Sequence, residues 1–186
     1  MRRQRPKLNL TPLLLRDVED LAAQAKTYKG KNGEGLFSRT TVIMAVIALD
    51  HFIDLYFDRI SPESKKREIK CKIERLRKDR KIGTTVAAKW FAVVSHYTLS
   101  RFPTNAPPFS DLKKLIKLRN RLVHLCQKHV QSRTRESVPN LLREVNWKTA
   151  EETCNTVKAM IAAFYQEARK NPPSWLDPGK IEPQSN

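Results

Sequence analysis

The 186-residue sequence predicts an all-α fold, a helical bundle of five to six helices. Apolar residues recur at spacings of three and four over most of the chain, which is the period of an α-helix. No segment alternates in the manner of a strand, and the eleven prolines and five glycines fall almost wholly between the periodic segments. The 40% of hydrophobic residues is enough to bury a core, which excludes global disorder.

The first two helices are marked by a start signal and by an apolar face. Thr11-Pro12 has the form of a cap followed by a first-turn proline, and it begins a helix that ends at a glycine-rich loop over 29–35. A longer helix is predicted from Ser38 to about Arg59. Its apolar stripe is the most complete in the chain, so we expect it to be the central helix. The stripe contains Val42, Ala45, Val46, Leu49, Ile53, Tyr56 and Phe57.

The next two predicted helices differ in polarity. A Ser-Pro-Glu triplet at 61–63 opens a helix whose few apolar residues are outnumbered by lysines and arginines, so it is expected to be mostly solvated. Thr84 caps a fourth helix, which is apolar around most of its circumference and is therefore expected to be buried.

Two further helices complete the predicted bundle. One runs from Ser110 to about Val130, and the last runs from Trp147 to about Asn171. In the last helix Thr149 is expected to be the cap, in a capping box with Glu152.

These elements predict one helical domain between two terminal segments. Residues 1–11 form a basic arm, residues 12–171 the helical domain, and residues 172–186 an irregular or disordered tail. The longest uninterrupted apolar run, Val42 to Leu49, is far shorter than the roughly 18 residues of a membrane span.

Three widely spaced cysteines without a Cys-x-x-Cys pair favour a reducing compartment and a place in the core. We therefore expect a cytoplasmic protein that spans no membrane.

The net charge predicts a polyanionic partner. The chain has 36 Lys+Arg against 19 Asp+Glu, which gives a formal charge of +17 and a pI near 10.1. An excess of this size attracts polyanions and makes their binding salt-dependent. By itself, the charge does not distinguish RNA from DNA or from an anionic membrane.

Arg119 breaks the pattern of its own helix. At about 100° per residue, the apolar residues of 111–130 form one stripe, and Arg119 falls in the middle of it. Burial of an unpaired guanidinium costs several kcal/mol, on the order of a large fraction of a domain's stability. One interpretation is a structural ion pair with an acid of the central helix, such as Asp50 or Asp54. The other is that the stripe faces a cleft or a second subunit.

The residues around Arg119 favour the second interpretation. Asn120 and His124 share one helix face at i, i+4. The string Arg119-Asn120-Arg121-Leu122-Val123-His124 resembles the R-x4-H motif, with Asn after the Arg, of the HEPN (higher eukaryotes and prokaryotes nucleotide-binding) superfamily. The all-helical domain, the position of the motif before one closing helix, and the Ser-Pro-Glu helix start are also similar to that family.

The resemblance implies a metal-independent endoribonuclease that acts as a homodimer, with the active site at the interface, and that serves as a toxin or defence effector. His124 would take the proton of a 2′-hydroxyl and give one to the leaving 5′-oxygen, for which histidine is suited near neutral pH. Arg119 would stabilise the charge that develops on the phosphorus oxygens. Asn120 would orient the histidine or donate to a phosphate oxygen. Asp50 and Asp54 could line the cleft beside the motif, although pairing with basic neighbours is the favoured interpretation.

RNA is the partner that the resemblance implies for the basic surface. The side chains assigned to RNA binding are Lys65, Lys66, Lys70, Arg77, Lys117, Arg121 and Lys128. The resemblance also allows an antitoxin or regulatory protein as a partner. In one toxin branch a tyrosine that the antitoxin modifies lies two residues after the histidine, and here that position is Cys126.

No metal and no cofactor are predicted. The tightest group of residues of metal-binding type is His124, Cys126 and His129. They lie on different sides of a helix, and no second cluster completes a tetrahedral site.

In an ideal helix the side chains of Arg119 and His124 point about 140° apart. We therefore expect a break or helix end between them, or convergence across the dimer. The alternative function is a non-catalytic helical RNA/DNA-binding or adaptor protein with Arg119 in a structural ion pair.

Overall fold

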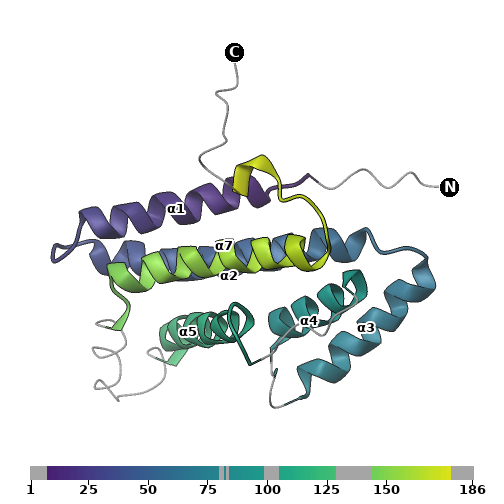
Figure 1. The fold of residues 1–186 in the computed structure, drawn as a ribbon. Coiled ribbons are helices and arrows are strands. Elements are labelled where there is room, and N and C mark those ends of the chain that lie inside the picture. Colours follow the sequence, from purple (N-terminus) through teal and green to yellow (C-terminus); the bar gives the residue numbers. More distant parts are fainter. Residues whose placement is uncertain (1–7, 80–81, 83, 99–104, 129–143, 177–186) are drawn as a thin grey trace.

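The structure, a computed structural model, describes residues 8–79, 82, 84–98, 105–128 and 144–176, and the side chains of all of these except 125–128. Within these ranges the chain is helical and contains no strand (Figure 1). The all-α class and the bundle of five to six helices are therefore confirmed. The elements are α1 (Thr11–Thr27), α2 (Glu34–Asp58), α3 (Glu63–Arg77), α4 (Thr85–Tyr97), α5 (Phe109–Lys128), α7 (Trp147–Glu167) and a short 3₁₀ helix, η1 (Ser174–Leu176).

Helix α2 is the central helix, as its apolar stripe predicted. It packs against α1 and α7 on one side and against α4 and α5 on the other, while α3 packs on α4 (Figure 1). Within the described chain, α2 is also the one helix long and apolar enough to cross a membrane. However, 56% of its most apolar window is buried inside the protein, and a helix at the centre of a core has the same composition.

Aromatic side chains fill the middle of the core. Phe52 of α2 is 1% exposed and stacks on Trp90 of α4, with ring centroids 5.5 Å apart. Phe164 of α7 meets the ring of Phe52 edge-on at 5.3 Å. The hydroxyl of Tyr56 donates a hydrogen bond of 2.7 Å to the hydroxyl of Tyr165. Burial, with this hydrogen bond in addition, raises the pKa of Tyr165. The aromatic cluster thus joins α2, α4 and α7.

Helix α2 begins at Glu34, four residues before the predicted start at Ser38. Gly33 precedes it with a φ of 110°, a conformation that glycine adopts readily and other residues rarely do. The Glu34 carboxylate accepts hydrogen bonds from the backbone N–H of Gly30, at 2.6 Å, and of Trp147, at 3.1 Å. The predicted loop over 29–35 is therefore shorter than expected, because its last two residues, Glu34 and Gly35, are helical.

The predicted cap of the last helix is wrong. Asn146 is the N-cap of α7, and its Oδ1 accepts from the backbone N–H of Lys148 at 2.9 Å and of Thr149 at 3.4 Å. The helix begins two residues before Thr149, which lies inside the first turn and donates its hydroxyl to the Glu144 carbonyl. The Thr149–Glu152 spacing matched a capping box by sequence alone.

The Asn146→Ala variant is expected to lower the free energy of unfolding by about 1 kcal/mol, because two backbone N–H groups of the first turn lose their acceptor. Glu152→Ala is the matched control, since Glu152 is exposed and does not belong to the cap. Urea denaturation of both variants measures the difference. This assignment of the cap would be contradicted if Glu152→Ala lowered the free energy of unfolding more than Asn146→Ala does.

One short segment of the predicted tail and one cysteine differ from expectation. Trp175 and Leu176, in η1, pack against the core, whereas an irregular tail was expected from residue 172. Residues 1–7 of the arm and 177–186 of the tail lie outside the described residues. Cys154 is buried as predicted, and burial raises the pKa of its thiol, but Cys71 is exposed.

Candidate functional site

Helix α5 carries Arg119, Asn120 and His124, and it is continuous from Phe109 to Lys128. Of the two predicted alternatives, a break or helix end between Arg119 and His124 is therefore not observed, and convergence across a dimer stays a prediction. Along a regular helix, a separation of five residues turns the two side chains about 140° apart. One chain consequently does not direct both side chains to the same point.

Four residues of the predicted apolar stripe of α5 are buried, Val123 is half-buried, and Arg119 lies among them. Leu112 is 0% exposed, Leu115 and Leu122 are 5% exposed, and Ile116 is 2% exposed. Arg119 is half-buried, and its Nη1 donates to Asn120 Oδ1 at 3.1 Å. Its Nε atom is buried and has no hydrogen-bond partner among the residues that the structure describes. An orphaned donor of this kind is unusual, because buried polar atoms in proteins are nearly always paired.

The structural ion pair between Arg119 and Asp50 or Asp54 is not formed. Both acids instead bind Lys89 of α4, whose Nζ lies 2.8 Å from Asp50 Oδ1 and 2.9 Å from Asp54 Oδ1. This confirms that the two acids pair with a basic neighbour. Burial lowers the pKa of Lys89, but the hydrogen bonds to the two carboxylates outweigh it, and the net shift of the pKa is upward. The competing cation comes from α4, and no local pattern in the sequence marks it as the partner of these acids.

Arg119 and Asn120 line a cavity of about 380 Å³ between α2, α4 and α5. Asp50 contributes the one carboxylate among the described lining residues, and Arg77, from the last turn of α3, contributes a second guanidinium. Thr84 and Thr85 add hydroxyl groups. The described lining thus has two guanidinium groups against one carboxylate, which suits an anionic ligand, and Arg77 also pairs with Glu74 at 3.4 Å.

Of the predicted catalytic residues and cleft acids, two are not among the described residues that line this cavity. Asp54, expected as a cleft acid beside Asp50, binds Lys89 without lining the cavity. His124 is exposed and lies about one turn beyond Asn120 on α5. The structure therefore brings together Arg119, Asn120 and Asp50, with Arg77 from the residues assigned to RNA binding.

Sequence reasoning missed the two threonines at this cavity. It assigned Thr84 only a capping role, which it does perform, since its hydroxyl accepts from the backbone N–H of Ala87 at 3.3 Å. Only the packing of α4 against α2 and α5 places the start of α4 at this cavity, so no local signal in the sequence could have revealed it.

The basic residues assigned to RNA binding have diverse environments. Lys70 and Lys117 are exposed. Three others form ion pairs: Lys65 with Glu68 at 2.8 Å, Arg77 with Glu74 at 3.4 Å, and Arg121 with Glu144 at 3.3 Å. Lys66 is half-buried, lies 3.5 Å from Asp58, and covers the ring of Phe57. The side chain of Lys128 lies outside the described residues.

Among the residues that the structure describes, no group of three or more His, Cys, Asp or Glu side chains is placed to hold a metal ion. The side chain of Cys126 and all of His129 lie outside that part of the chain. Comparisons of the chain with models of protein families, with curated proteins and with solved structures found no match.

Proposed function

We propose that the protein is a metal-independent endoribonuclease that acts as a homodimer, with Arg119 and His124 as catalytic residues. The observation that carries the proposal is the state of Arg119. Its guanidinium lies half-buried at a cavity, its Nε has no hydrogen-bond partner in the described part of the chain, and Asp50 and Asp54 are bound to Lys89. A fixed positive charge that the protein does not neutralise is suited to a phosphodiester.

The chemistry assigns a role to each residue. His124 accepts the proton of the ribose 2′-hydroxyl as the 2′-oxygen forms a bond to phosphorus. The bond from phosphorus to the 5′-oxygen breaks, and the leaving oxygen receives a proton from an imidazolium. Arg119 stabilises the negative charge on the non-bridging oxygens, and Asn120, hydrogen-bonded to Arg119, orients that guanidinium. The products are a 2′,3′-cyclic phosphate and a 5′-hydroxyl.

A second copy of the chain completes the proposed site. Within one chain the regular helix α5 separates the directions of Arg119 and His124, and His124 is exposed instead of lining the Arg119 cavity. In a two-fold dimer the same helix face occurs on both subunits, so Arg119 of one copy and His124 of the other can face one RNA strand. The exposed Lys70 and Lys117 assist RNA capture. A role as a cytoplasmic toxin or defence effector, with an antitoxin or regulatory protein as partner, follows from the resemblance of the motif alone.

One observation favours a second function. A monomer with the same unbroken α5 would keep Arg119 and His124 apart, and the basic surface would still attract nucleic acid. The protein would then be a non-catalytic helical RNA/DNA-binding or adaptor protein. Solution mass separates the two functions, because a strict monomer leaves each motif without its facing copy.

Incubation of the purified protein with total RNA in excess EDTA tests the proposal. Wild type is expected to cut the RNA and to leave 2′,3′-cyclic phosphate ends, whereas Arg119→Ala is expected to leave it intact. Lys114→Ala is the matched control, because it removes an exposed cation from the same helix, outside the Arg119 cavity, and should cut as wild type does. The proposed endoribonuclease activity would be refuted if the wild-type protein left the RNA intact, or if Arg119→Ala cut the RNA as fast as wild type.

A further inference from the structure

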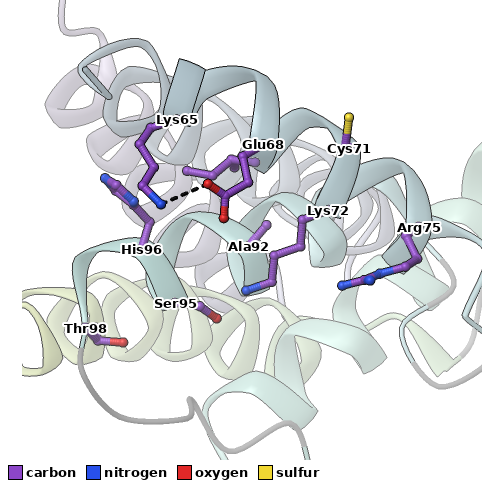
Figure 2. A pocket seen from close by; sticks show the side chains of 10 residues that line it. Lys65, Glu68, Cys71, Lys72, Arg75, Ala92, Ser95, His96 and Thr98 are labelled. Carbon is purple, nitrogen blue, oxygen red and sulfur yellow. Dashed lines mark hydrogen bonds and ion pairs between the residues drawn. The ribbon is translucent and has the colours of Figure 1, made fainter. Parts of the chain in front are cut away.

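A second and larger cavity lies between α3 and α4 (Figure 2). Its volume is about 820 Å³, and it shares no described lining residue with the Arg119 cavity. The polar residues that line it include Lys65, Glu68, Lys72, Arg75, Ser95 and His96. A cavity of this size falls within the range of sites for small organic ligands, roughly 300–1,000 Å³.

The charges at this cavity are unbalanced. Glu68 is the one carboxylate among the described lining residues, and it binds Lys65 at 2.8 Å. The hydrogen bond from Lys65 lowers the pKa of Glu68, which keeps the carboxylate ionised and neutralises that lysine. Lys72 and Arg75 have no carboxylate within ion-pair distance in the described part of the chain, and His96 adds a third basic group.

Lys72 and Arg75 are positioned to act on one ligand. Figure 2 shows both side chains extending from α3 into the same space in front of α4. Lys72 is half-buried, with its Nζ 5.5 Å from the centre of the Phe91 ring. Burial, and then the charge of Arg75, lowers the pKa of Lys72. Two neighbouring cations, one of them partly removed from water, repel each other, and an anion bound between them would relieve this repulsion.

The rest of the lining is suited to the organic part of a ligand. Ile69 and Ala92 are 5% and 1% exposed and form an apolar wall. The Ser95 hydroxyl donates to the Phe91 carbonyl, and its oxygen keeps a lone pair to accept a hydrogen bond from a ligand. The cavity thus combines a cationic side with an apolar side.

We propose that the cavity between α3 and α4 binds a small organic phosphate of nucleotide size. Its phosphates contact Lys72 and Arg75, and its organic part packs against Ile69 and Ala92. Ammonium and guanidinium groups form their strongest hydrogen bonds with phosphate oxygens, and several phosphates match the several cations. The site is independent of the proposed ribonuclease activity, because it uses none of the residues assigned to cleavage.

Calorimetric titration at low salt tests the site, with ATP, inorganic pyrophosphate and a short single-stranded RNA as three separate titrants. ATP is expected to bind with a stoichiometry of one per chain, and more tightly than pyrophosphate, since pyrophosphate lacks the organic part. Arg75→Gln and Lys72→Gln should each weaken ATP binding about tenfold. Arg75 is exposed, so its substitution does not disturb the core. Arg67→Gln is the matched control, because it removes an exposed charge from α3 outside the cavity lining.

A substitution that strengthens binding tests the same site from the opposite direction. Glu68→Gln removes the carboxylate that occupies Lys65 and is expected to raise ATP affinity about threefold. Glu74→Gln removes an equivalent exposed acid, paired with Arg77 outside this cavity, and should leave the affinity as it is. The proposal is overturned by an absence of ATP binding, by equal weakening in Arg67→Gln, or by binding of the RNA but not of ATP.

Discussion

A His124→Ala variant is expected to cleave RNA about 10²–10⁴-fold more slowly than wild type in the EDTA buffer, because general acid–base catalysis contributes that much. His124 is exposed on α5, so its removal leaves the core untouched. Initial rates on a defined RNA give the loss, and circular dichroism confirms the fold. Cleavage by the folded variant at the wild-type rate would exclude a role for the histidine.

The two inactive variants also test whether the site is shared between subunits. Co-expressed Arg119→Ala and His124→Ala chains form mixed dimers in which one site keeps an intact arginine and an intact histidine. Random pairing predicts recovery of roughly a quarter of the wild-type rate, since half of the dimers are mixed and each has one intact site. Each variant expressed alone is the control. Mixed dimers with no recovered activity would contradict a site formed across the interface.

The Phe52→Ala variant is expected to lower the free energy of unfolding by about 3–5 kcal/mol. Phe52 is 1% exposed and contacts the rings of Trp90 and Phe164, so truncation leaves a cavity where three helices meet. Leu36→Ala is the control on the same helix, because Leu36 is 59% exposed and its loss should cost less than about 0.5 kcal/mol. Urea denaturation measures both variants. Similar losses in the two variants would show that Phe52 is not central to the core.

The sequence predicted those features that depend on periodicity. The stripe of α2, the buried face of α5 and the place of Arg119 within that face all follow from residues three and four apart. Features that depend on packing between distant segments were not predictable. The pairing of Asp50 and Asp54 with Lys89 joins residues 35 or more positions apart, and no local pattern marks Lys89 as their partner.

The basic helix α3 illustrates a second limit of sequence reasoning. Its lysines and arginines were interpreted as one solvated RNA-binding face. In the structure, Lys72 and Arg75 turn toward α4 and line a cavity, whereas Lys70 is exposed outside that lining. Residues of the same type on one helix therefore differ in role according to which neighbour the helix packs against, and this information is absent from the helix's own sequence.

Glu34 has a consequence for the direction of the two longest packed helices. Its carboxylate binds the first residue of α7 while Glu34 itself begins α2, and near the opposite ends the hydroxyls of Tyr56 and Tyr165 meet. Helices α2 and α7 therefore run parallel, so their macrodipoles place two partial positive charges side by side. The carboxylate of Glu34 lies at that shared end and offsets the repulsion between the two partial charges. A single acidic residue thus stabilises the parallel packing of two neighbouring helices.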